Sequence, residues 1–114
     1  MDKFTKAYIE CALWASQDDS GEPLDSNYSI NDIAPDTLAS MTEDCKDFQD
    51  ANAELMEGLD PEQCGHDFWL TRNGHGAGFW DRGLGEIGEK LTDQAQAYVG
   101  CDLYVGDDGK VHAC

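Results

Sequence analysis

Basic residues are scarce in this chain: 7 Lys and Arg face 24 Asp and Glu, which gives a formal net charge of −17. Nucleic acid and anionic membrane surfaces repel so acidic a protein, so we do not expect direct binding to either. No apolar run approaches the roughly 20 residues that span a bilayer, and the first residues lack a secretory signal pattern. We therefore expect a soluble intracellular protein.

The chain also lacks paired cysteine motifs. Its five cysteines are widely spaced and include no C-x-x-C pair, which argues against a zinc ribbon or a thioredoxin-like redox site. Cys11 and Cys45 fall within apolar helical patterns, where a reduced cysteine behaves as a small hydrophobic residue. We expect reduced thiols in the core and no cofactor.

At 114 residues, of which 40% are hydrophobic, the chain suits one domain, residues 1–114. Helical spacing of apolar residues predicts helices over 3–16, from Pro35 to about Gly58, and over 84–99. The segment 17–32 is rich in Asp, Ser, Asn, Gly and Pro and is predicted to be a loop.

Two segments are predicted to form β-hairpins. Residues 66–72 and 77–81 are aromatic and strand-like, and Asn73-Gly74 between them is typical of a tight turn. A second hairpin is predicted over residues 103–112, around Gly106-Asp107-Asp108-Gly109. The predicted fold class is α+β: an acidic helical half (1–60) and a second half (61–114), in the order α-α-β-β-α-β-β, with three helices and a small antiparallel sheet.

The acidic residues are concentrated in the middle of the chain, where residues 17–64 hold 14 acids and one base. On the predicted long helix, five of them recur at spacings of 4, 3, 4 and 3 and form one stripe opposite the apolar face. Ordinary exposed helix faces mix charges, because like charges at i,i+4 cost about 0.2–0.5 kcal/mol per pair. We expect this stripe to bind a partner, together with Asp36 and Asp44 on the same helix. Its members are Glu43, Asp47, Asp50, Glu54 and Glu57.

The segment from His66 to Gly83 offers a weaker alternative. His66, Asp67, His75 and Asp81 are side chains of the kinds that hold a divalent metal, with His112 as a possible addition. Their spacing matches no established ligand motif, so we expect a structural hairpin there and no metal. The aromatic residues of this segment are expected to pack in the core, and Arg72 and Arg82 to pair with nearby carboxylates.

The string HDFWLTRNGHGAGFWDRG, followed by LGEIGEKLTDQAQAYVG and LYVGDDGKVH, resembles a group of small bacteriophage and prophage proteins. The resemblance covers about residues 65–112. It implies a phage origin and a host cytoplasm, and it brings no catalytic residues. In size and acidity the chain is also similar to phage anti-CRISPR and anti-restriction proteins that imitate nucleic acid.

These observations favour a non-enzymatic inhibitor over two alternatives. We expect the acidic stripe to occupy a nucleic-acid channel of a host defence complex, with its carboxylates in place of phosphates. One alternative is a small metal-dependent enzyme built on His66, Asp67, His75 and Asp81. The other is an interaction domain that binds through its aromatic segment, for which an exposed Trp69 or Trp80 would be the sign.

Overall fold

Five α-helices and a β-hairpin form the fold in the computed structural model, which describes residues 1–75, 77–100 and 102–113. The helices are α1 (Lys3–Ala15), α2 (Pro35–Ala51), α3 (Ala53–Met56), α4 (Pro61–Arg72) and α5 (Glu86–Gln96). Short 3₁₀ turns are η1 (Leu24–Ser26), η2 (Ile30–Asp32) and η3 (Phe79–Asp81). Strands β1 (Leu103–Val105) and β2 (Val111–Ala113) pair antiparallel, with Leu103 opposite Ala113. The predicted α+β class is confirmed, with more helix and less sheet than expected.

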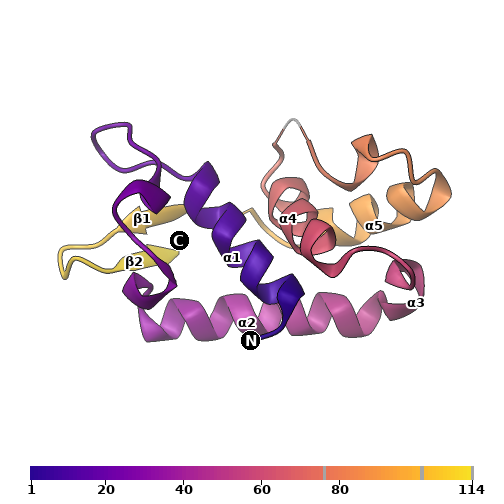
Figure 1. The fold of residues 1–114 in the computed structure, drawn as a ribbon, viewed down its shortest axis with the longest axis horizontal. Coiled ribbons are helices and arrows are strands. Elements are labelled where there is room, and N and C mark those ends of the chain that lie inside the picture. The colour runs from indigo at the N-terminus through magenta and orange to yellow at the C-terminus, as the bar shows by residue number, and fades with distance from the viewer. Residues whose placement is uncertain (76, 101, 114) are drawn as a thin grey trace.

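The helix α2 lies along one long edge of the molecule, and α1 crosses over it (Figure 1). The helices α4 and α5 lie over one half of α2, and the β-hairpin lies over the other half. The molecule measures 43 × 25 × 21 Å. At about 1.5 Å per residue, α2 is about 26 Å long. It therefore extends along more than half of the molecule's longest dimension, and the other elements pack along it.

The first two predicted helices exist, and their starts have clear causes. The Asp2 carboxylate caps α1 by accepting a hydrogen bond from the Thr5 backbone N–H at 2.8 Å. Pro35 occupies the first turn of α2, where its missing N–H costs nothing.

The predicted long helix, however, ends earlier than expected. α2 stops at Ala51, because Asn52 leaves the helical conformation and its buried side-chain amide donates to the Phe48 carbonyl at 2.9 Å. The short helix α3 then continues in a new direction (Figure 1). The prediction of one helix reaching Gly58 is therefore wrong.

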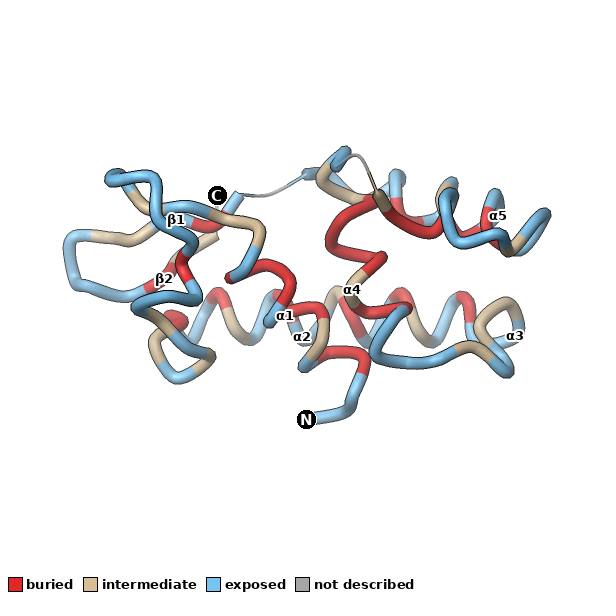
Figure 2. Tube along the Cα trace, turned by 45° about the horizontal axis from the view of Figure 1, so that its top comes forward, coloured by how far each residue is buried: buried red, intermediate tan, exposed pale blue. Residues whose placement is uncertain are grey.

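The predicted strand at 66–72 is also wrong, because these residues belong to α4. Asp60 caps this helix by accepting from the Glu62 backbone N–H at 3.1 Å, and Pro61 fills its first position. Almost every residue from Cys64 to Thr71 is buried, so α4 runs through the middle of the molecule (Figure 2). A helix buried on all sides has no polar face, and its sequence lacks the amphipathic period by which helices are predicted.

The turn at Asn73-Gly74 ends α4 and does not join two strands. Gly74 has φ +70°, its N–H bonds the Thr71 carbonyl at 3.2 Å, and the His75 N–H bonds the Leu70 carbonyl at 3.0 Å. This pair of bonds is the Schellman arrangement that closes many helices. The predicted strand at 77–81 is wrong too, because it contains η3. The order α-α-β-β-α-β-β is thereby corrected.

One core contains side chains from both halves of the chain. Phe48 of α2 stacks on Phe68 of α4 at 4.2 Å between ring centroids, and Phe79 of η3 stacks on Phe48 at 5.8 Å. Tyr8 of α1 and Tyr98, just after α5, pack against Phe68 at 5.1 and 5.0 Å. The aromatic residues expected in the core are there, except Trp80, whose side chain is exposed.

Two further predicted elements are present. The helix over 84–99 is present as α5, and the C-terminal hairpin is present as β1 and β2. The segment 17–32 packs against the core through buried Leu24 and half-buried Tyr28 and Ile30.

Three of the five cysteines are placed in the core. Cys11, Cys45 and Cys64 are free and buried, and burial raises the pKa of Cys11 to about 12 and that of Cys64 to about 11. The expected position of Cys11 and Cys45 in the core is confirmed. Cys101 and Cys114 lie outside the described residues.

Candidate partner-binding surface

Four exposed carboxylates lie on one face of α2, and we call this set the α2 carboxylate face. Each lies 7, 4 or 3 residues after the one before, a spacing that keeps them within a narrow sector of the helix. From Asp36 to Asp50 the helix rises about 21 Å. The face consists of Asp36, Glu43, Asp47 and Asp50.

The two remaining acids of the predicted stripe lie beyond the break at Asn52. Glu54 belongs to α3 and Glu57 follows it, and both are exposed. The stripe is therefore divided: its straight part is on α2, and these two carboxylates extend it after a change of direction.

The charges of the α2 carboxylate face are largely uncompensated. Within the described part of the chain, Asp36, Glu43 and Asp47 form no ion pair. Asp50 pairs with Lys46 at 2.9 Å, and this contact raises the pKa of the Lys46 ammonium group. Both side chains of the pair are exposed to water, where such a pair contributes little to stability.

Asp44 serves the fold itself. Its carboxylate lies 2.8 Å from Nη1 of Arg72, whose side chain is 7% exposed. The same guanidinium donates to the Tyr8 hydroxyl at 3.0 Å and to the Val99 carbonyl at 2.6 Å. Asp44 thus belongs to a network that joins α1, α2, α4 and the segment after α5.

The negative charge of α2 affects the neighbouring hydroxyl group of Tyr98. Burial raises the pKa of its hydroxyl, and the nearby carboxylates of Asp47 and Asp44 raise it further. The expected acidic surface therefore begins at the edge of the aromatic core.

The proposed metal ligands are not brought together. Within residues 1–75, 77–100 and 102–113, no three His, Cys, Asp or Glu side chains form a group that could hold a metal ion. Asp67 is buried on α4, where Arg82 binds it with Nε and Nη2 at 3.1 and 2.9 Å. Asp81 lies 3.7 Å from the same guanidinium. The expected pairing of arginines with nearby carboxylates is present for Arg82, which contacts both Asp67 and Asp81 and so occupies two of the four candidate ligands, whereas Arg72 pairs with the distant Asp44.

The three histidines lie in different surroundings. The His66 ring lies beside the Trp14 ring, with 6.0 Å between centroids. His75 is exposed after the end of α4. His112 on β2 pairs with Asp108 at 3.0 Å across the hairpin turn. In the predicted hairpin, with its two-residue turn at Asn73-Gly74, His66 would have faced Asp81 on the opposite strand; the helical conformation of 61–72 removes that pairing.

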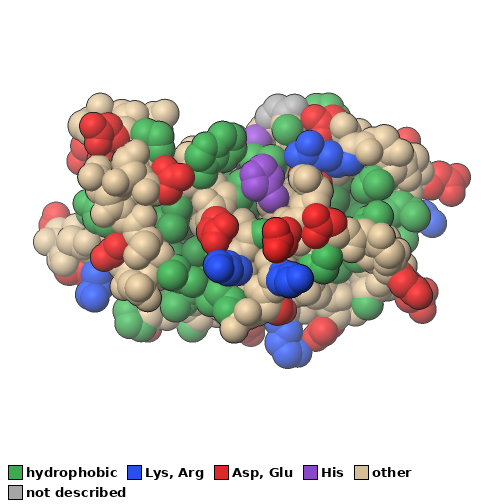
Figure 3. All heavy atoms as spheres, in the orientation of Figure 1, with side chains coloured by type: hydrophobic (Ala, Val, Ile, Leu, Met, Phe, Trp, Pro, Cys, Tyr) green, Lys and Arg blue, Asp and Glu red, His purple; other side chains and the backbone are tan. Residues whose placement is uncertain are grey.

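Figure 3 shows a face of mixed charge over α1 and α4, where acidic side chains lie beside basic ones and next to a histidine. A hollow of about 540 Å³ opens there between the two helices. Its lining includes Trp14, His66 and Arg82, together with four carboxylates. These are Glu10, Asp25, Asp60 and Glu62.

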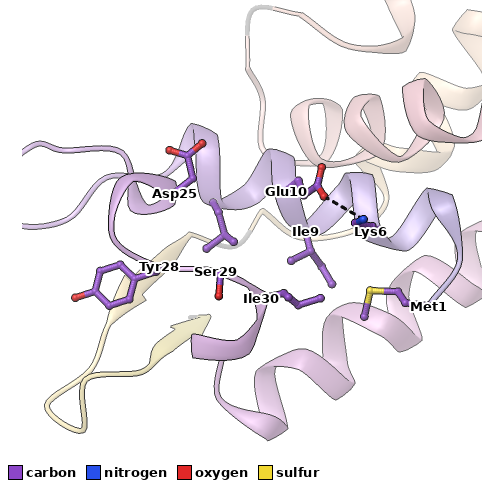
Figure 4. Close-up of a pocket in the computed structure, with 9 residues that line it drawn as sticks. Met1, Lys6, Ile9, Glu10, Asp25, Tyr28, Ser29 and Ile30 are labelled. Carbon is purple, nitrogen blue, oxygen red and sulfur yellow. Dashed lines mark ion pairs between the residues drawn. The ribbon is translucent and has the colours of Figure 1, made fainter.

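A second hollow, of about 580 Å³, lies on the other side of α1 (Figure 4). Ile9 and Leu13 of α1 and Ile30 of η2 give it an apolar lining, and Lys6 and Glu10 form an ion pair at 4.0 Å on its rim. Glu10 and Asp25 line both hollows.

Trp14 is the surface residue that the sequence pattern did not identify. It lies near the end of α1, and its side chain is 58% exposed. Trp69, which was considered as an exposed contact residue, is buried, whereas Trp80 is 53% exposed.

No family model, curated protein sequence or solved structure matches this chain. No described helix combines the length and the apolar character needed to cross a bilayer.

Proposed function

We propose that this chain is a phage-encoded, non-enzymatic inhibitor that acts in the host cytoplasm. It binds a nucleic-acid-binding complex of bacterial defence, of the kind that anti-CRISPR or anti-restriction proteins block. The α2 carboxylate face occupies the basic groove that normally receives nucleic acid, and its carboxylates take the positions of phosphates.

One observation carries this proposal: three carboxylates on one straight helix face are exposed and have no ion-pair partner among the described residues. Neighbouring members of the face three or four residues apart are separated by about 5–6 Å along the helix. This is comparable with phosphate spacing along a single strand, about 3.4 Å of axial rise per nucleotide, once side-chain reach is included. A rigid helix also holds these charges in place before binding, which reduces the entropy lost on association.

The test uses two variants with equal net charge. One changes Glu43, Asp47 and Asp50 to Lys and reverses the α2 carboxylate face. The control changes three exposed acids elsewhere, Glu89, Asp93 and Asp107, to Lys. Each moves the formal net charge from −17 to −11.

Tagged wild-type and variant proteins are incubated at low salt with a lysate of bacteria that carry several defence systems. We expect the wild type and the control to retain a complex that added DNA duplex releases. The α2 variant should retain at least about tenfold less, because reversed charges repel a basic groove. Equal retention by both variants, or a complex that DNA does not release, would contradict the proposal; circular dichroism checks that both variants are folded.

A further inference from the structure

From the hollow between α1 and α4 we infer a second recognition site, which binds an arginine side chain of a protein partner. Its residues are separate from the α2 carboxylate face, so it stands even if that face has no partner. The site is built on Trp14, with carboxylates around it.

Trp14 provides an aromatic face that is free to bind. More than half of its side chain is exposed, and the only ring packed against it in the described structure is that of His66, tilted by 35°. The π face of tryptophan attracts cations more strongly than that of any other side chain, and guanidinium groups also stack on it. An exposed tryptophan beside a hollow is a typical anchor of protein interfaces.

The charges around Trp14 favour a cation as the occupant. Four carboxylates line the hollow, whereas its one arginine, Arg82, is already neutralised by buried Asp67. Lys6 offsets the charge of Glu10 only weakly, since their atoms are 4.0 Å apart and both side chains are about two-thirds exposed. The hollow therefore keeps a net negative charge.

The chemistry of the lining favours a guanidinium over an ammonium group. A guanidinium presents five N–H donors in a planar fork, which suits the carboxylates of the hollow, and its flat face can stack on the indole of Trp14. A lysine ammonium carries the same charge but cannot stack on the indole in this way.

The distinction between arginine and lysine gives the test. Short peptides with three arginines or three lysines are titrated into the protein by calorimetry, so that both probes have equal charge. We expect the arginine peptide to bind about fivefold more tightly than the lysine peptide, because stacking on Trp14 adds to the charge attraction.

Two tryptophan variants complete the experiment. Trp14→Ala should remove the preference for arginine, whereas Trp80→Ala, at a tryptophan of similar exposure on η3, should preserve it. A preference that survives Trp14→Ala, or equal affinity of the wild type for both peptides, would overturn the inference. Both variants keep the α2 carboxylate face unchanged. The capture experiment therefore tests the proposed function independently of these peptide titrations.

Discussion

At the scale of single residues, Arg72 organises the contacts between helices. Its guanidinium lies 5.7 Å from the Phe68 ring and 5.3 Å from the Tyr98 ring, and its N–H groups bond a carboxylate, a hydroxyl and a carbonyl. These partners come from elements far apart in the sequence. A planar, permanently charged group with five donors can satisfy all of them at once.

We therefore expect Arg72→Lys to destabilise the protein even though the charge is kept. The ammonium group cannot reach Tyr8, Asp44 and Val99 together, and the loss should be about 2 kcal/mol of unfolding free energy. Urea denaturation measures it, with Lys90→Arg on the exposed side of α5 as a control expected within about 0.5 kcal/mol of wild type. An Arg72→Lys protein as stable as the wild type would show that the network is dispensable.

At the scale of elements, the sequence correctly predicted the helices and strands that have one buried face and one solvent-exposed face. The helices α1, α2 and α5 show apolar residues on one side and polar residues on the other, and the C-terminal hairpin has a clear glycine-containing turn. The helix α4 has no solvent-exposed face, since after its first turn every residue is buried except His66 and Arg72, which are half-buried. Its Phe-Trp-Leu run is typical of strands, and burial on all sides decided in favour of helix.

The local signals for α4 were nevertheless present. Asp60-Pro61 is a typical helix start, and Asn73-Gly74 fits a helix end as well as a hairpin turn. Only part of the candidate binding surface could be predicted from the sequence. The spacing of the acidic residues predicted the carboxylates of α2. The break at Asn52 and the exposure of Trp14 depend on tertiary packing, which a single sequence does not display.

Two glycines, one within α4 and one just after its end, test this description of the helix. At Gly74 an alanine has room but must adopt a positive φ, so Gly74→Ala should cost about 1 kcal/mol of unfolding free energy. At Gly65 a Cβ would overlap the Phe4 carbonyl oxygen where α1 crosses α4.

At Gly65, two opposing effects of alanine decide the sign of the change. Its helix propensity favours Gly65→Ala by about 1 kcal/mol, but the clash with backbone that cannot move should cost about 3 kcal/mol. The net loss at Gly65 should therefore exceed the loss at Gly74, as thermal or urea unfolding would measure. The reverse order would mean that α1 and α4 do not pack this closely.

At the scale of the whole molecule, charge is divided between a folded interior and an acidic exterior. The arginines are used within the fold, where Arg72 and Arg82 neutralise Asp44 and Asp67. Most of the remaining acids lie at the surface, among them those of the α2 carboxylate face. We therefore expect the net charge of −17 to speed association with a basic partner.

The most direct test of nucleic-acid mimicry is competition on the captured complex. The complex is mixed with a labelled DNA duplex, and wild-type protein is added at low and at high salt. We predict that protein and DNA exclude each other and that the affinity of the protein falls steeply with salt, less so for the variant reversed at Glu43, Asp47 and Asp50. A ternary complex of protein, partner and DNA, with an affinity that salt does not change, would contradict the account.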